Sequence, residues 1–154
     1  MKIRILSVGR KGTGWVAEAE KDYLKRLRHF TDMSCELLTP EDEHSLGGKA
    51  CAERESAKLL GKCRPDDCII ACDPRGASYN SKQLADELRN FHDRGAKICF
   101  VIGGSHGLTK ELLAQARMTV SFSLFTFPHE LFRVMLLEQL YRAFTIISGI
   151  KYHK

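Results

Sequence analysis

The apolar residues of this chain follow two spacings that change from one segment to the next. Short runs in which every position or every second position is apolar are typical of strands, whereas longer segments with apolar residues three and four positions apart are typical of helices with one buried side. The pattern predicts strands at residues 2–8, 33–38, 67–72, 97–102 and 118–121, and helices at residues 13–29, 49–62, 80–92, 109–115 and 130–147.

The expected strands and helices alternate from one end of the chain to the other. Strands that are apolar on both faces and are separated by amphipathic helices predict a parallel sheet with helices on both faces. The segment Asp73-Pro74-Arg75-Gly76 is expected to form a turn, and Asn80 or Ser81 to cap the helix after it. Because the sequence contains no repeat and no linker, we expect residues 1–154 to form a single α/β domain.

The last expected helix, residues 130–147, is apolar around nearly its whole circumference. A helix of this kind must be buried on more than one side. In so short a protein, we expect a second copy of the chain to cover its outer side, most simply in a two-fold homodimer. The alternative is a helix at the centre of the monomer's own core.

Composition and charge narrow the class of protein. The chain is 44% hydrophobic and 28% charged, which is typical of a globular domain and excludes a disordered or collagen-like chain. No apolar run approaches the roughly 18 residues of a membrane helix, and residues 1–6 do not resemble a secretory signal, so we expect a cytoplasmic protein with no membrane partner. The net charge of +5 is compatible with an anionic partner such as RNA. The six cysteines have no metal-ligand spacing, so we expect structural thiols and no metal.

Two glycine-rich motifs follow expected strands. Residues 12–17 fit the dinucleotide pattern G-x-G-x-x-A, but the first glycine lies too far beyond the strand, and no acidic residue ends the second strand. Residues 103–107, Gly-Gly-Ser-His-Gly, fit the nucleophile elbow of serine hydrolases, with Ser105 as the nucleophile, although the chain is short for that class. The same glycines also allow the backbone to approach a ligand closely at the carboxyl edge of the sheet.

Residues 127–154 place several polar side chains within and beside the apolar helix. Burying polar groups costs several kcal/mol unless each of them is paired. Their concentration around one helix therefore favours a functional site, and they are His129, Arg133, Glu138, Gln139 and Arg142.

The chain also resembles a known family, through motifs spread over its whole length. The matching residues are 5–9, Asp73 with Gly76, 101–104 with 107–108, 121–123, 126–129, Arg133, 138–139, 141–143 and 152–154. Together they resemble the RlmH family of SPOUT methyltransferases, which modify large-subunit ribosomal RNA. The resemblance implies a homodimer with a SPOUT-type α/β knot, a trefoil knot near the C-terminus. It also implies methyl transfer from S-adenosyl-L-methionine to N3 of a pseudouridine in 23S rRNA on the assembled ribosome.

The resemblance implies two groups of site residues. The residues expected to bind the cofactor are Cys72, Gly103, Phe122, Ser123, Leu124, Phe125, Thr126 and Phe127. Of the residues expected to be catalytic, His153 is the first candidate for the base that removes the N3 proton, and His129 is the second. Arg142 and Arg133 are expected to hold a phosphate or the uracil oxyanion, and Tyr152 to stack on the target base. The remaining alternatives are a serine hydrolase at Ser105 and a non-catalytic ribosome-binding dimer.

Overall fold

A computed structural model describes residues 1–153 as one five-stranded parallel sheet with helices on both faces. The strands are β1 (Lys2–Val8), β2 (Asp32–Leu38), β3 (Asp67–Ser78), β4 (Lys97–Ile102) and β5 (Met118–Ser121), and their order in the sheet is β2-β1-β4-β3-β5. The helices are α1 (Gly14–Leu27), α2 (Glu43–Leu46), α3 (Gly48–Lys62), α4 (Ser81–Asp93), α5 (Lys110–Gln115) and α6 (His129–Ile147). The predicted fold class, a parallel sheet covered on both faces, is confirmed.

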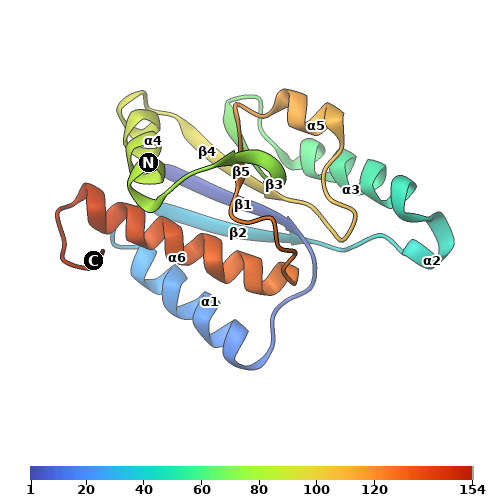
Figure 1. The fold of residues 1–154 in the computed structure, drawn as a ribbon, viewed down its shortest axis with the longest axis horizontal. Helices are drawn as coiled ribbons and strands as arrows, with labels where there is room; N and C mark the ends of the chain where they lie inside the picture. The colour runs from blue at the N-terminus through green and yellow to red at the C-terminus, as the bar shows by residue number, and fades with distance from the viewer. Residues whose placement is uncertain (154) are drawn as a thin grey trace.

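Two apolar layers explain why the strands carry no polar face. Figure 1 shows α3 and α5 on one side of the sheet and α1 and α6 on the other. On the side of α6, alternate strand residues such as Ile5 and Phe100 pack with α4 and α6, and on the other side Leu6 and Val101 pack with α3 and α5. Each central strand therefore buries both of its faces, as its continuous apolar run predicts.

The end of β3 differs from the prediction. The segment Asp73-Pro74-Arg75-Gly76 was expected to leave the sheet as a turn, but β3 continues to Ser78. The turn signal corresponds to an irregularity in the ladder, because the pairing of β3 with β5 shifts register between Cys72 and Ala77. Gly76 is required there, since a Cβ at this position would lie 2.6 Å from the carbonyl carbon of Thr119. The bulge therefore bends β3 around β5 at the carboxyl edge of the sheet.

The helix boundaries follow local chemistry. Asn80 caps α4 as predicted, with a capping box formed with Gln83. The short helix α2 was not predicted, because its four residues contain one apolar side chain. At the other end, Gly149 has a φ of 67° and ends α6, where the amide of Ile150 donates to the carbonyl of Thr145 at 2.9 Å.

The helix α6 is more enclosed by its own chain than its apolar circumference suggested. It packs against α1, α4 and β1, and none of its residues is fully exposed. Phe132, Val134 and Met135 of this helix remain half-buried. No helix within residues 1–153 is long and apolar enough to cross a bilayer. The trefoil knot stays a prediction.

Candidate active site

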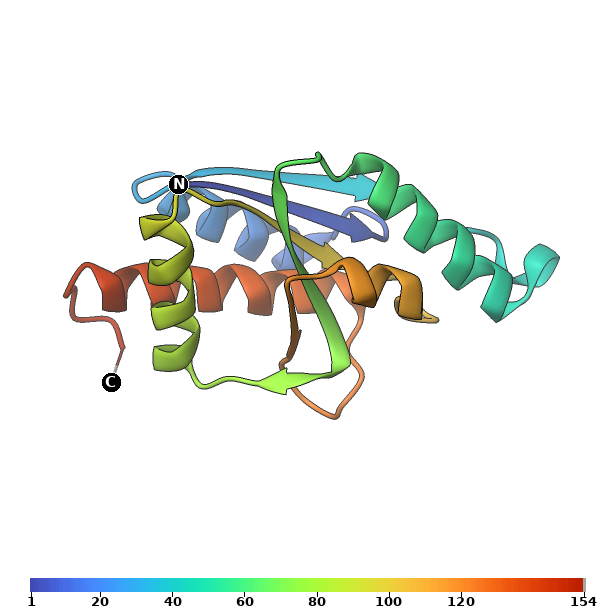
Figure 2. The same cartoon turned by 90° about the horizontal axis from the view of Figure 1, so that it is seen from above.

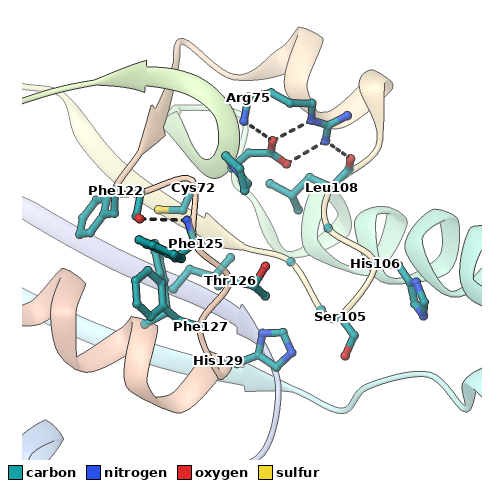
Figure 3. Close-up of a pocket in the computed structure, with 18 of the residues that line it drawn as sticks. Cys72, Arg75, Ser105, His106, Leu108, Phe122, Phe125, Thr126, Phe127 and His129 are labelled. Carbon is teal, nitrogen blue, oxygen red and sulfur yellow. Dashed lines mark hydrogen bonds and ion pairs between the residues drawn. The ribbon is translucent and has the colours of Figure 1, made fainter.

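A cavity lies at the carboxyl ends of β3, β4 and β5, which is where open parallel sheets bind ligands. Its volume is about 720 Å³, within the range of small-molecule and cofactor sites. Val120 of β5 and three segments line it: the end of β3 from Cys72 to Arg75, residues 102–108 from the end of β4 onward, and residues 122–132 after β5, of which Leu124, Glu130 and Leu131 lie outside the lining. Figure 3 shows Arg75 at one end of this pocket and His129 at the other.

The loop of residues 103–107 forms one wall. A Cβ at Gly103 would lie 2.8 Å from the carbonyl carbon of Gly107, so the glycine is required by the loop's own fold as well as by any ligand. Gly107 has a φ of 73°, in the left-handed region, and its amide donates to the carbonyl of Gly104 at 3.0 Å. The loop therefore closes on itself and turns its backbone toward the pocket.

An ion pair holds the rim of the pocket next to β3. The carboxylate of Asp73, which is 2% exposed, accepts from Nε of Arg75 at 2.7 Å and from its Nη2 at 2.8 Å. Arg75 also donates to the carbonyl of Leu108 at 2.7 Å, which ties β3 to the 103–108 segment. Burial raises the pKa of Asp73, but the hydrogen bonds and charge of Arg75 outweigh it, and the net pKa lies below its usual value.

The opposite wall is apolar. Burial, with a smaller contribution from the charge of Asp73, raises the pKa of Cys72 to about 12, so this side chain remains a neutral thiol. Phe122 and Phe127 line the pocket from the loop after β5, where Ser123 fixes the turn by accepting from the amide of Phe125 at 2.9 Å. The backbone amides and carbonyls of Thr126 and Phe127 form no hydrogen bond within residues 1–153. The wall thus combines apolar side chains with free backbone groups.

Seven of the eight residues expected to bind the cofactor line this pocket: Cys72, Gly103, Phe122, Ser123, Phe125, Thr126 and Phe127. Leu124 does not line it, and its side chain is 92% exposed. Asp73 and Arg75 were missed as rim residues, although a carboxylate at the end of a buried strand, two positions before an arginine, was a signal for them.

The residues expected to be catalytic separate into three places. His129 lines the pocket. Arg133 does not reach it, because its side chain is 1% exposed and donates from Nε to Glu20 at 2.7 Å and from Nη2 to the carbonyl of Arg10 at 3.0 Å. This guanidinium joins α6 to α1 and to the loop before it, which is a positioning role.

Arg142, Tyr152 and His153 form a cluster at the far end of α6. Glu138 is its centre: Nε of Arg142 donates to Glu138 at 3.0 Å and the hydroxyl of Tyr152 donates to it at 3.2 Å. His153 Nδ1 lies 3.5 Å from Nη1 of Arg142, and the guanidinium stacks over the ring of Tyr152 at 4.9 Å. Burial, a hydrogen bond with Tyr23 and the nearby carboxylate raise the pKa of Tyr152, so it stays protonated.

The cluster and the pocket are far apart within one chain. His129 and Arg142 are thirteen residues apart in α6, or about 20 Å along the axis at about 1.5 Å per residue. Figure 2 shows the C-terminal tail and the loop after β5 at opposite ends of α6. Within one chain, the tail therefore does not lie over this pocket. The predicted helix length alone implied this separation.

A second cavity of about 580 Å³ runs along α6 between these two places. It shares Val120 and Phe122 with the first pocket, and His153 lies in its lining. Val134 and Met135 of α6 face Leu84 of α4 across it. This apolar groove connects the two parts of the candidate site.

The motif at Ser105 lacks the partner of a serine nucleophile. Within residues 1–153 the hydroxyl of Ser105 donates no hydrogen bond to a histidine, and the adjacent His106 pairs instead with Glu43 at 3.1 Å. The serine hydrolase alternative therefore has no structural support.

The fold and the pocket define an α/β protein with a cavity at the carboxyl edge of a parallel sheet. The family model described as "Predicted SPOUT methyltransferase" matches residues 1–153, and the chain belongs to the SPOUT methyltransferase family. It is 38% identical to "Ribosomal RNA large subunit methyltransferase H" of Desulfotalea psychrophila over 100% of both chains. It is 40% identical to the protein of the same name from Pelotomaculum thermopropionicum over 98% of both chains.

Solved structures agree with the fold. A structure from Haemophilus influenzae Rd KW20, described as a probable methylase family protein, superposes with a TM-score of 0.56 at 18% identity. The superposition covers 99% of this chain and 70% of that one. At this identity the likeness concerns the fold alone.

Proposed function

We propose that this protein methylates the RNA of the large ribosomal subunit, with S-adenosylmethionine as the methyl donor and N3 of a pseudouridine in 23S rRNA as the acceptor. The observation that carries the proposal is the pocket at the carboxyl ends of β3, β4 and β5 in a chain of the SPOUT methyltransferase family. The full-length relatives named for large-subunit ribosomal RNA support the substrate class, and the RlmH resemblance supports the pseudouridine. Such a substrate implies action in the cytoplasm.

The pocket fits the proposed cofactor in size and chemistry. An adenine ring needs an apolar slot with backbone hydrogen bonds at its edge, and the phenylalanines of the loop after β5 lie beside the free backbone groups of Thr126 and Phe127. Cys72 and the backbone of Gly103 would hold the cofactor from the sheet. When bound, S-adenosylmethionine supplies a methyl group on a positively charged sulfur.

The protein's own residues would prepare the acceptor. N3 of the base carries a proton, which a neutral imidazole can accept near neutral pH. We assign this role to His153, which lies beside Arg142, and the alternative base is His129 in the pocket. Arg142 would stabilise the uracil oxyanion, and the protonated Tyr152 would stack on the base.

These roles require two chains. Because about 20 Å of helix separates the tail cluster from the pocket, a tail can serve a pocket only when it comes from a second subunit. The apolar groove between α4 and α6 supports a homodimer formed across α6, since it leaves Val134 and Met135 only half-buried in one chain. The proposed active site is therefore shared, with the cofactor held by one subunit and the catalytic tail supplied by its partner.

Methylation of unmodified ribosomes tests the function. Ribosomes would be incubated with the protein and isotope-labelled S-adenosylmethionine, and the RNA digested to nucleosides for mass spectrometry. We expect the label in a methylated pseudouridine of the large-subunit RNA. Label in another nucleoside would replace the proposed acceptor, and the absence of labelled RNA would contradict the function. A fluorophosphonate probe that labelled Ser105 would instead support the hydrolase.

The pH profile separates the two histidines. If His153 is the base, His153→Ala should lower turnover by ~10²-fold, with part of the loss recovered at high pH as N3 ionises unaided. His129→Ala should then reduce cofactor affinity more than turnover. The reverse pattern would assign the base to His129.

A further inference from the structure

The segment of residues 9–15, which runs from the loop after β1 into the first turn of α1, presents a tryptophan to solvent. Trp15 is 65% exposed, whereas the adjacent Val16 is 8% exposed. A large aromatic ring in this position keeps most of its apolar surface in contact with water. An exposed ring of this kind offers a flat face on which another molecule can stack.

Two cations lie in the same loop. Arg10 and Lys11 are exposed, and neither belongs to an ion pair within the described part of the chain. Free cations beside an exposed aromatic ring are the combination with which proteins bind single-stranded nucleic acid, because the cations contact phosphates while the ring stacks on a base.

The loop is fixed at the rim of the cofactor pocket. A Cβ on Gly9 would lie 3.4 Å from Cβ of His129, and His129 lines the pocket. The amide of Gly9 donates to the carbonyl of Leu38 at 3.0 Å, and the carbonyl of Arg10 accepts from the buried Arg133 at 3.0 Å. Figure 1 shows the loop passing the first turn of α6 on its way from β1 to α1.

We propose that Arg10, Lys11 and Trp15 form an RNA-docking surface, on which the indole stacks on an unpaired nucleobase near the target nucleotide and the two cations bind the adjacent phosphates. This inference rests on the proposed function, since it requires an RNA substrate. Charge complementarity favours RNA over a second copy of this chain, because two such loops facing each other would bring four cations together. The buried Arg133, which binds Glu20 and the carbonyl of Arg10, keeps this surface in a fixed position relative to the pocket.

The fluorescence of Trp15 reports directly on this surface, because it is the one tryptophan of the protein. The full-length protein would be titrated with a short single-stranded oligouridylate at several salt concentrations. We expect quenching that saturates and weakens as salt rises. The double variant Arg10→Ala/Lys11→Ala should flatten the plot of log affinity against log salt by about 1.4, since each phosphate contact contributes about 0.7 on a single strand. Arg94→Ala, an exposed cation at the opposite edge of the sheet, should leave the slope unchanged.

Steady-state kinetics on ribosomes give the second test. Trp15→Ala should raise KM for the ribosome by about tenfold and leave kcat and cofactor affinity unchanged, whereas Trp15→Phe, which retains a stacking face, should restore most of the KM. Absence of quenching, or an unchanged KM for Trp15→Ala, would overturn the proposal. A Trp15→Ala protein that sediments as half the mass of the wild type would assign the loop to a subunit interface instead. Because the titration needs no methyl transfer, RNA binding without methylation would contradict the proposed function and leave this surface intact.

Discussion

The two parts of the candidate site, near the first turn of α6 and along its C-terminal half, consist of different kinds of residues. At its first turn, glycine loops, a neutral thiol and phenylalanines enclose a cavity of about 720 Å³. In its C-terminal half, Arg142 is joined with Tyr152 through hydrogen bonds to Glu138 at the middle of the helix, beside His153. The first arrangement is suited to holding a small molecule through shape and backbone groups, and the second to handling charge and protons. Substitutions at one end should therefore affect binding, and substitutions at the other should affect turnover.

Arg133 lies in the N-terminal part of α6, near the pocket, but its substitution should affect neither cofactor binding nor turnover directly. Arg133→Ala leaves the carboxylate of Glu20, which is 16% exposed, without its ion pair, so we expect the free energy of unfolding to fall by roughly 3 kcal/mol. The matched control is Arg142→Ala on the same helix, whose side chain is 26% exposed and whose loss should cost about 1 kcal/mol or less. Urea denaturation measures both. An Arg133→Ala protein that is as stable as the wild type but has no turnover would show that Arg133 acts in catalysis.

Deleting residues 149–154 separates the two ends most cleanly. These residues follow α6 and contact it through Tyr152, which donates to Glu138 at 3.2 Å, while the packing of α6 on α4 does not involve them, so the melting temperature should fall by only a few degrees. Turnover on ribosomes should fall by about 10²-fold or more, because the proposed base is removed. Calorimetry should give the wild-type affinity for S-adenosylmethionine. A truncated protein that methylates at the normal rate would exclude the tail from catalysis.

Gly103→Val tests the pocket end. The new side chain would overlap the backbone of Gly107, so the loop must move and the affinity for S-adenosylmethionine should fall by about tenfold or more. Gly61→Ala is the control, since a Cβ there meets nothing within 4 Å and removing a helical glycine should stabilise α3 by up to about 1 kcal/mol. Wild-type cofactor affinity in Gly103→Val would contradict the placement of the cofactor against this loop.

Asp73→Asn has the smallest expected effect and carries a pH signature. Because the pKa of Asp73 is lowered by folding, its ion pair contributes stability above the ordinary pKa and loses it as pH falls through the lower folded value. At about pH 7 the variant should be less stable than the wild type by about 1 kcal/mol, and the difference should shrink below about pH 4. Asp86→Asn removes an exposed pair with Arg89 and should show no such pH dependence. If Asp73→Asn remained less stable than the wild type below about pH 4, the ion pair between Asp73 and Arg75 would not be the source of the difference.

The sequence predicted the order of strands and helices along the chain better than it predicted the contacts between strands in the sheet. Periodicity located all five strands and five of the six helices, because burial on both faces leaves an uninterrupted apolar run. It failed at β3, where Pro74 and Gly76 give the local signal of a turn but pairing with β5 keeps the segment extended. Periodicity also identifies a helix without showing which of its apolar residues a neighbour covers, and Trp15 of α1 is left exposed.

The site was predictable in part for a similar reason. The cofactor residues lie in short segments that follow strands, so the parallel sheet itself gathers them at one edge. The sequence did not show that His129 and His153, the two alternative bases, lie apart along a helix of nineteen residues. Arg133 was expected to be catalytic because a buried arginine and a catalytic one look alike in sequence.

Mixed dimers test the central claim that the two ends cooperate across subunits. Gly103→Val, which impairs the pocket, and the deletion of residues 149–154, which removes the tail, would each be prepared as homodimers and then combined through two different affinity tags. The shared site predicts that both homodimers are nearly inactive on ribosomes, while the mixed dimer regains activity because one of its two sites combines an intact pocket with an intact tail. A mixed dimer no more active than the homodimers would contradict the shared site and assign catalysis to a single chain.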